Sequence, residues 1–276
     1  MSSLVRIATV AAHFGRDLEF DMRRIAFFVD DARRAGASVL VFPDGTLGGC
    51  HFTLPRTGCD TLPPALGSDD KHLHRIAGLA AEMVVCAGYH EAADDGNWYN
   101  SAVCVTGDGI LGRHRQVHQP SGEPSIHAAG DRFAAFDTPV GRFGMVIDYD
   151  KVFPESARTL ALDGARVVAC LSAWPAAGGR TTESRDRQAR LFDLYDCARA
   201  AENQIVFVSA NQTGSLHGVR FVGQAKVVDS GGVIRARTGA RPALAVAELD
   251  LDAQPTGARH APRHLDERRP DSYASV

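Results

Sequence analysis

Short apolar segments with the two-residue period of β-strands outnumber helical segments along this chain, and this imbalance limits the folds that it can adopt. The segments with helical spacing occur in pairs between groups of strand-like segments. Two sheets packed face to face, with the helices outside, would bury the apolar faces of all these elements. The sequence therefore predicts an α/β protein with two packed sheets.

The periodicity and the turn residues between segments give approximate boundaries. Strands are predicted at 5–11, 38–42, 83–89, 99–106, 110–116, 133–137, 142–147, 167–171, 205–211, 221–228, 233–237 and 244–249, and helices at 18–32, 69–81, 154–162 and 184–203. Gly107-Asp108-Gly109 between two strands is typical of a hairpin. Because no repeat or linker divides the chain, we expect a single domain over residues 1–276, with an extended polar tail from about residue 253.

Composition and charge exclude several classes of function. The formal net charge is −3, and without basic clusters the sequence gives no support for nucleic-acid binding. The N-terminal apolar run is short and alternates like a strand, which indicates neither a signal peptide nor a membrane span. The six cysteines form no CxxC pair, so we expect free thiols in a cytoplasmic protein.

Three polar residues stand where a predicted strand ends or a loop begins, with no evident structural reason. Asp44 lies in "VFPDGTLGG", Gln116 in "GRHRQVHQP" and Asp148 in "GMVIDYDKVFPE". A lone carboxylate at such a place most often turns the chain or caps a helix. The question is whether these three belong to one site.

The stretches around these residues resemble the nitrilase (carbon–nitrogen hydrolase) superfamily, and the resemblance extends along nearly the whole chain. It rests on "GASVLVFPDGTLGG", "LGRHRQVHQPSGEP" and "GRFGMVIDYDKVFPESARTLALDGARVV", followed by "ARAAENQIVFVSANQTG" and "DERRPDSY". The resemblance implies a four-layer αββα sandwich of two packed mixed β-sheets with helices outside. It also implies a homodimer or a higher homo-oligomer.

In that family a glutamate acts as general base, a lysine stabilises the oxyanion, and a cysteine forms a thioester. Carried over by motif position, this sequence has Asp44, Gln116 and Asp148 at those three places, and it keeps the family's second, supporting glutamate as Glu123. The chain contains only three lysines, and none lies in the motif around Gln116. Cys50 follows the first motif by six residues, where a small filler is expected.

Three carboxyl groups, from Asp44, Glu123 and Asp148, would then converge opposite the neutral Gln116. Like charges raise at least one of their pKa values. Either one carboxyl keeps a proton and acts as general acid while another acts as base, or a cation enters the pocket. That cation would be a divalent metal bound by oxygen ligands or a cationic substrate. We expect no cofactor, and the two alternatives stay open.

Further residues of this neighbourhood have expected roles in substrate binding. The backbone N–H of Tyr149 would donate to a substrate oxygen. The resemblance places Trp174 at the end of a strand that lines the pocket, although a core tryptophan is equally compatible with the sequence. His118 lies two residues after the lysine position, where the resemblance implies a histidine that helps to hold the site residues in place.

These residues lead to three functional hypotheses. The first is a nitrilase-fold enzyme with a rewired active site that acts on a small, amine- or amide-bearing metabolite by carboxylate acid–base catalysis without a covalent thioester. Hydrolysis, elimination, isomerisation and cyclisation all fit, and a biosynthetic pathway would be the setting. The alternative is a pseudoenzyme that binds a ligand or a protein partner. The third hypothesis, residual amide or nitrile hydrolysis, is disfavoured because an oxyanion donor is missing.

Overall fold

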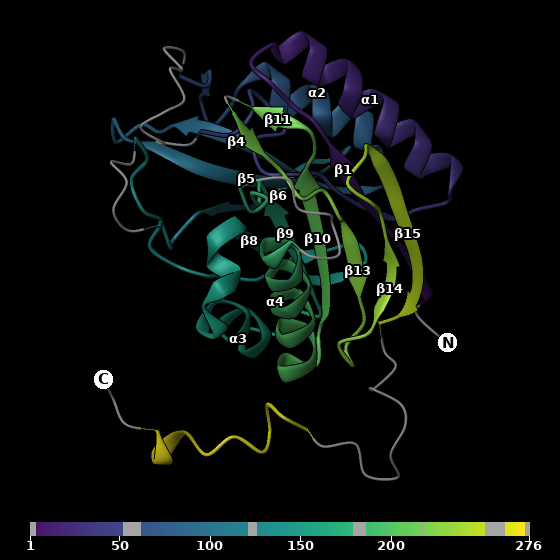
Figure 1. Ribbon diagram of the computed structural model, residues 1–276, viewed down its shortest axis with the longest axis vertical. Helices are drawn as coiled ribbons and strands as arrows, with labels where there is room; N and C mark the ends of the chain where they lie inside the picture. Colours follow the sequence, from purple (N-terminus) through teal and green to yellow (C-terminus); the bar gives the residue numbers. More distant parts are fainter. Residues whose placement is uncertain are drawn as a thin grey trace.

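Two helices cover each side of a folded β-sheet core (Figure 1). The computed structural model describes residues 4–51, 62–120, 126–178, 186–216, 218–251 and 263–273. The strands are β1 (Leu4–Ala12), β2 (Val39–Val41), β3 (Ala65–Leu66), β4 (Val84–Ala92), β5 (Trp98–Thr106), β6 (Gly109–Arg115), β7 (Phe136–Thr138), β8 (Gly141–Ile147), β9 (Val167–Ser172), β10 (Val206–Gln212), β11 (Ser215–Leu216), β12 (Val219–Arg220), β13 (Lys226–Val228), β14 (Ile234–Arg237) and β15 (Ala243–Asp250). The helices are α1 (Leu18–Arg34), α2 (Lys71–Ala80), α3 (Pro154–Leu162) and α4 (Arg187–Asn203), with short 3-10 helices η1 (Asp148–Val152) and η3 (Pro270–Ser272).

The hydrogen-bonded strands run in the order β6-β5-β4-β2-β1-β10-β9-β8-β7, and the two halves of this ladder meet where β1 pairs with β10 at Ala11 and Ala12. Apolar residues of β2, β4 and β5 lie in one buried cluster with those of β8, β9 and β10, so the two halves face each other. The outer faces pack against α1 and α2 on one side and against α3 and α4 on the other. These layers confirm the predicted αββα sandwich, whose halves are joined by a short pairing.

Strand direction decides where a site can form. Strands β1, β2, β4, β8, β9 and β10 are parallel to one another along the ladder. Strand β6 points the same way, because β5 is antiparallel to both β4 and β6. The carboxyl ends of all these strands therefore meet at one edge, the place where open α/β sheets usually bind ligands.

Local sequence explains the helix boundaries. Asp17 caps α1 by accepting hydrogen bonds from the N–H groups of Glu19 and Phe20. Asp186 caps α4 in the same way, and that helix ends at Gln204 in the left-handed conformation. The expected α3 is confirmed with its first residue, Pro154, at a position where the missing N–H costs nothing.

Two predicted strands begin several residues later than expected. The segment 221–228 forms a strand only at its end, because Gly223 and Gln224 have positive φ values of 65° and 57°. The segment 133–137 begins its pairing at Phe136. The hairpin at Gly107-Asp108-Gly109 is confirmed between β5 and β6. Among the residues that the structure describes, no helix is long and apolar enough to cross a membrane.

Candidate active site

The three candidate residues lie at the shared carboxyl edge of the strands. Asp148 directly follows β8, Gln116 directly follows β6, and Asp44 comes three residues after β2. The backbone N–H of Asp44 donates to the carbonyl of Ser172 at 3.3 Å, which ties the loop after β2 to the end of β9. The edge therefore brings together residues from both halves of the sandwich.

Asn100 links these residues, and sequence reasoning missed it. Its side-chain Nδ2 lies 3.2 Å from Oδ2 of Asp44 and 3.1 Å from Oε1 of Gln116. Gln116 in turn donates from Nε2 to the carbonyl of Ile147, the residue before Asp148, at 3.4 Å. The only sequence signal for this role was a polar side chain inside the buried strand β5. One amide thus joins the general-base position to the position where the resemblance placed a lysine.

Asp44 is a buried carboxyl with an unsatisfied oxygen. It is 4% exposed, and among the residues that the structure describes its Oδ1 has no hydrogen-bond partner. Burial raises the pKa of Asp44 from its ordinary value of 3.8 to about 7, and the nearby charge of Asp148 raises it further, against the hydrogen bond from Asn100. A buried, unpaired carboxylate oxygen is costly, so this group favours a proton or a ligand donor.

Asp148 is held in an unusual backbone conformation at the tip of β8. Its φ is +43°, in the left-handed region that is uncommon for residues with a side chain. Its Oδ1 accepts a hydrogen bond from the N–H of Ala173 at 3.1 Å. Burial raises the pKa of Asp148 to about 6, and the positive charge of Lys151 and the Ala173 N–H oppose this effect.

Asp150 fixes the turn that carries Asp148. Its carboxylate accepts hydrogen bonds from the N–H groups of Ile147 at 3.1 Å and His118 at 2.8 Å, and it contacts the rings of His114 at 2.9 Å and His118 at 3.1 Å. Burial would raise the pKa of Asp150, but the hydrogen bonds from both histidines outweigh burial and lower it. Asp150 is therefore an ionised anchor, and the ring of His118 that contacts it is stacked on Phe153 at 3.8 Å.

The remaining predicted residues lie in different surroundings. Tyr149 is partly exposed, with its ring edge-on to Phe153. Trp174 is 6% exposed and its indole Nε1 donates to the carbonyl of Gln188, so the tryptophan is packed in the core. Glu123 lies outside the described residues. Within the described ranges, no group of three or more His, Cys, Asp or Glu side chains is arranged to hold a metal ion.

Two further side chains border the site. Lys151 is fully buried three residues after Asp148, and sequence reasoning set it aside because it lies outside the motif around Gln116. Cys50 packs with Ala173 in a small apolar cluster. Burial, and next the charge of Asp44, raise the pKa of the Cys50 thiol well above its ordinary value, so this thiol stays neutral. Arg115 pairs with Glu91 at 2.7 Å instead of reaching the site.

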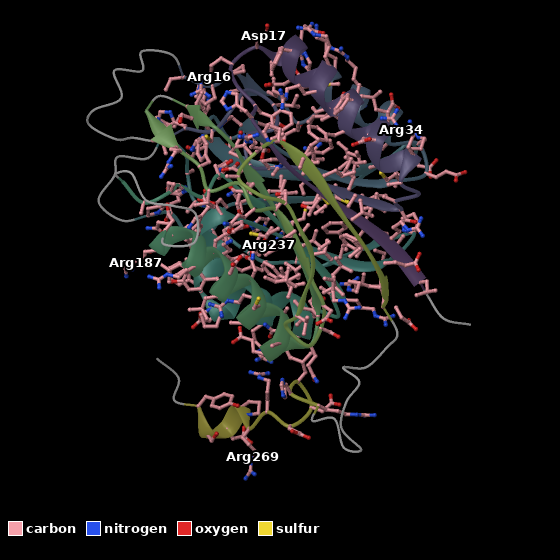
Figure 2. The ribbon with its side chains drawn as sticks, turned by 45° about the vertical axis from the view of Figure 1, so that its right-hand side comes forward. Arg16, Asp17, Arg34, Arg187, Arg237 and Arg269 are labelled. Carbon is pink, nitrogen blue, oxygen red and sulfur yellow. The ribbon has the colours of Figure 1, made fainter. Side chains whose placement is uncertain are left out.

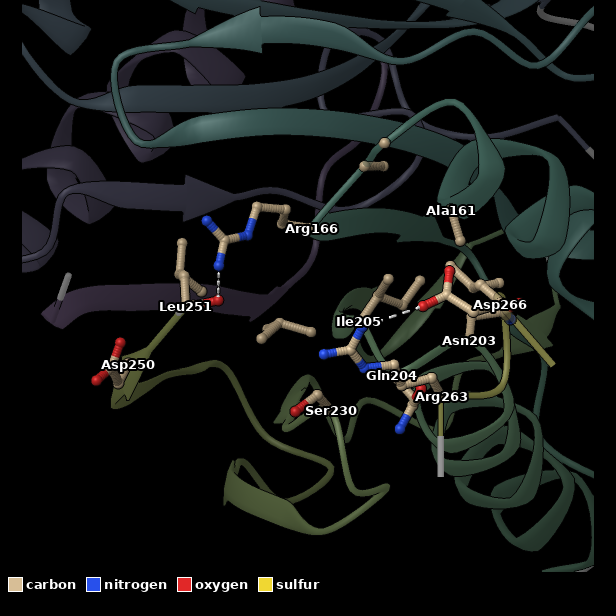
Figure 3. A pocket seen from close by; sticks show the side chains of 14 residues that line it. Ala161, Arg166, Asn203, Gln204, Ile205, Ser230, Asp250, Leu251, Arg263 and Asp266 are labelled. Carbon is tan, nitrogen blue, oxygen red and sulfur yellow. Dashed lines mark hydrogen bonds and ion pairs between the residues drawn. The ribbon is translucent and has the colours of Figure 1, made fainter. Parts of the chain in front are cut away.

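A separate cavity lies at the other end of the strands. Its volume is about 370 Å³, and it is bordered by the residues that enter β9 and β10, including Arg166, Ile205 and Val206, together with Asp250 and Arg263 (Figure 3). In the lining of this cavity, Arg166 donates a hydrogen bond to the carbonyl of Leu251. None of the candidate site residues lines this cavity, so it does not extend the site.

We expect Gln116→Lys to lower the pKa of Asp44, because an ammonium beside Asn100 would lie near this buried carboxyl. The free energy of unfolding of the variant, minus that of wild type, should be about 1–2 kcal/mol higher at pH 8 than at pH 5. Urea unfolding at both pH values measures this. Gln119→Lys on the same segment is the control, and an equal gain in both variants would contradict a local effect.

Comparison with known proteins places these observations in a family. The sequence matches the Carbon-nitrogen hydrolase family model over residues 6–256. An (R)-stereoselective amidase from a Pseudomonas species is 34% identical over 241 residues, which cover 84% of this chain and 79% of the amidase. A nitrilase from Pyrococcus abyssi is 34% identical over 230 residues, covering 81% of this chain and 80% of the nitrilase. The crystal structure of a carbon-nitrogen hydrolase from Helicobacter pylori G27 has the same fold, with a TM-score of 0.80 at 21% identity over 99% of this chain and 97% of that one. The chain belongs to the carbon–nitrogen hydrolase family.

Proposed function

We propose that this protein is a nitrilase-fold enzyme that acts on a small amine- or amide-bearing metabolite by non-covalent acid–base catalysis between carboxyl groups. Asp148 and Asp44 would exchange protons with the substrate, Gln116 would orient a carbonyl, and Glu123 would tune the pair. Hydrolysis, elimination, isomerisation or cyclisation in a biosynthetic pathway all fit these roles. The relatives, which include amidases and a nitrilase, support chemistry at a carbon–nitrogen bond.

The observation that carries this proposal is the buried Oδ1 of Asp44, which has no hydrogen-bond partner among the described residues. Burial raises the pKa of this carboxyl to about 7 and that of the nearby Asp148 to about 6. Because the charge of Asp148 raises the pKa of Asp44, one carboxyl would keep its proton near neutral pH while the other is ionised. This division supplies an acid and a base in one pocket. A cationic amine would satisfy the same pocket by pairing with the ionised group.

A covalent route has less support from the described residues. A carboxylate attacking an amide would form an acyl anhydride, which lies uphill of a thioester. Gln116 offers only a neutral amide that already donates to the carbonyl of Ile147. The thiol of Cys50 is buried and neutral, and it is not positioned as an ionised nucleophile.

Ligand binding and turnover test the proposal together. We expect a member of a panel of small aliphatic amines and primary amides to raise the melting temperature of wild type by roughly 5–10 °C at saturating concentration. Asp148→Asn keeps the shape and the hydrogen bond from Ala173 but removes the ionisable group, so this stabilisation should disappear. Asp137→Asn, at the exposed end of the β7–β8 hairpin, is the matched control.

Mass spectrometry of the same mixtures separates the hypotheses. Conversion of the bound compound by wild type, and not by Asp148→Asn, supports acid–base catalysis. Binding without conversion over the pH range 5–8 would overturn catalysis in favour of the pseudoenzyme. An acyl adduct on a cysteine would overturn the non-covalent mechanism. We also propose a homodimer or higher homo-oligomer, which light scattering checks.

A further inference from the structure

A line of alternating charges runs from the protein surface to the turn that carries Asp148. It begins at the partly exposed Arg237 on β14 (Figure 2), whose guanidinium lies 3.4 Å from Asp193 of α4. Asp193 lies 3.0 Å from Lys226 of β13, which lies 3.0 Å from Asp196. The other oxygen of Asp196 lies 2.9 Å from Nζ of Lys151. We call Lys151, Asp196 and Lys226 the buried triad, since all three side chains have zero exposure.

Helix α4 holds both the side chain and the backbone of this turn. Asp196 of α4 pairs with the Lys151 ammonium. One helical turn further along α4, Arg199 donates from Nε to the carbonyl of Lys151 at 2.9 Å and from Nη2 to the carbonyl of Val152 at 2.7 Å. These bonds connect η1 rigidly to α4, so the conformation of η1 depends on charged partners as well as on apolar packing.

Lys151 and Asp148 approach the same short segment after β9. In a 3-10 helix, residues three apart lie on one face, which places Lys151 on the side of Asp148. The Lys151 ammonium lies 4.8 Å from the ring centre of Trp174 and 3.3 Å from that of Phe192. The residue before Trp174 is Ala173, whose N–H donates to Asp148. Among the described contacts, no hydrogen bond or ion pair joins Lys151 to Asp148, so Lys151 acts on it through space.

The charges around Asp148 show what Lys151 contributes. Burial raises the pKa of Asp148, and Lys151 is the strongest electrostatic influence in the opposite direction. Asp150 and Asp196 raise the pKa, and Asp44 is a further nearby carboxyl. Buried ion pairs add little net stability compared with apolar residues of the same volume. A role in tuning the site therefore accounts for the buried triad better than stability does.

We propose that Lys151 is a positioning residue, held by Asp196 and Arg199, that fixes the turn of Asp148. Its positive charge offsets the negative charges of the carboxylates around Asp148. Asp196 sets the strength of this effect, because its carboxylate offsets the ammonium that it holds. The inference rests on the proposed function in taking Asp148 as the reacting group. The predicted effect of Lys151 on the titration of Asp148 concerns the protein alone and does not require a substrate.

The test is a titration of Asp148 by NMR with ¹³C-labelled aspartate, in which Asp148→Asn identifies the signal. In Lys151→Met the midpoint of Asp148 should rise by about one pH unit or more. In Asp196→Asn, which keeps the shape and removes a negative charge that raises the pKa of Asp148, the midpoint should fall. Lys71→Met, at an exposed lysine at the start of α2, should leave the midpoint unchanged.

Opposite shifts in the two triad variants are a result that general loosening of the fold would not produce. Unchanged midpoints, or shifts of the same sign, would overturn the proposal. If Lys151→Met fails to fold, the titration midpoint of Asp148 in Asp196→Asn decides the question: a lower midpoint supports the proposal, and an unchanged or higher one overturns it. Because the titration needs no substrate, a failed search for turnover leaves this result standing, and a flat titration leaves the acid–base hypothesis open to its own test.

Discussion

Asp196→Ala is expected to lower the free energy of unfolding by about 3–5 kcal/mol. Asp196 has zero exposure and its two carboxylate oxygens lie 2.9 and 3.0 Å from the ammonium groups of Lys151 and Lys226. Removing the carboxylate leaves two buried cations facing each other. Burial already lowers the pKa of Lys226, which shows how costly its charge is even with the carboxylate in place. Urea unfolding at pH 7 measures the loss.

Asp30→Ala on α1 is the matched control, because it makes the same exchange in a helix at an exposed ion pair. Exposed pairs of this kind contribute about 0–1 kcal/mol, so the control should stay near wild type. A triple variant, Lys151→Met with Asp196→Leu and Lys226→Met, should recover most of the stability, because it removes all three charges of the buried triad. A triple variant as unstable as Asp196→Ala would attribute the loss to packing instead of charge.

Much of the fold followed from local patterns. Apolar alternation and the Gly107-Asp108-Gly109 turn predicted β5 and β6, and the helix predicted from residue 154 begins at Pro154 in the structure. The predicted strand 221–228 does not form over its first residues, because positive φ values at Gly223 and Gln224 depend on the chain that packs around them. The short β1–β10 pairing that joins the two halves could not be predicted from the sequence either, since it depends on the curvature of the whole sheet.

Only the site residues that occupy recognisable motif positions could be predicted from the sequence. Asp44, Gln116 and Asp148 were identified from their places at strand ends, and the structure brings them to one edge, where Asn100 joins Asp44 to Gln116. The role of Asn100 depends on a partner 56 residues away, a distance that no local pattern encodes. Lys151 was set aside because the search was for a lysine in one motif, whereas its ammonium is directed by Asp196, on a helix 45 residues later.

Asp44→Asn is expected to stabilise the protein at pH 8 by about 2–4 kcal/mol relative to wild type. The pKa of Asp44 is about 7 in the folded protein and near 3.8 when the chain is unfolded. Between these values the folded state binds the extra proton, so the stability from this group is fully present below pH 3.8 and is lost as pH rises through 7. Asparagine stays neutral at every pH and avoids that loss. Its amide oxygen can still accept from Asn100, and its amide nitrogen would occupy the place of the unpaired Oδ1.

The pH dependence distinguishes this effect from better packing. The advantage of Asp44→Asn should shrink steadily from pH 8 towards pH 4, as measured by urea unfolding at several pH values. Asp163→Asn provides the opposite case, because hydrogen bonds from the Ala135 N–H and from Arg142 lower the pKa of that carboxyl, and its loss should weaken the fold at pH 8. An Asp44→Asn variant that is less stable than wild type at pH 8 would show that the ionised Asp44 is well accommodated. The proton needed for acid catalysis would then have to come from Asp148, because burial would not keep Asp44 protonated near neutral pH.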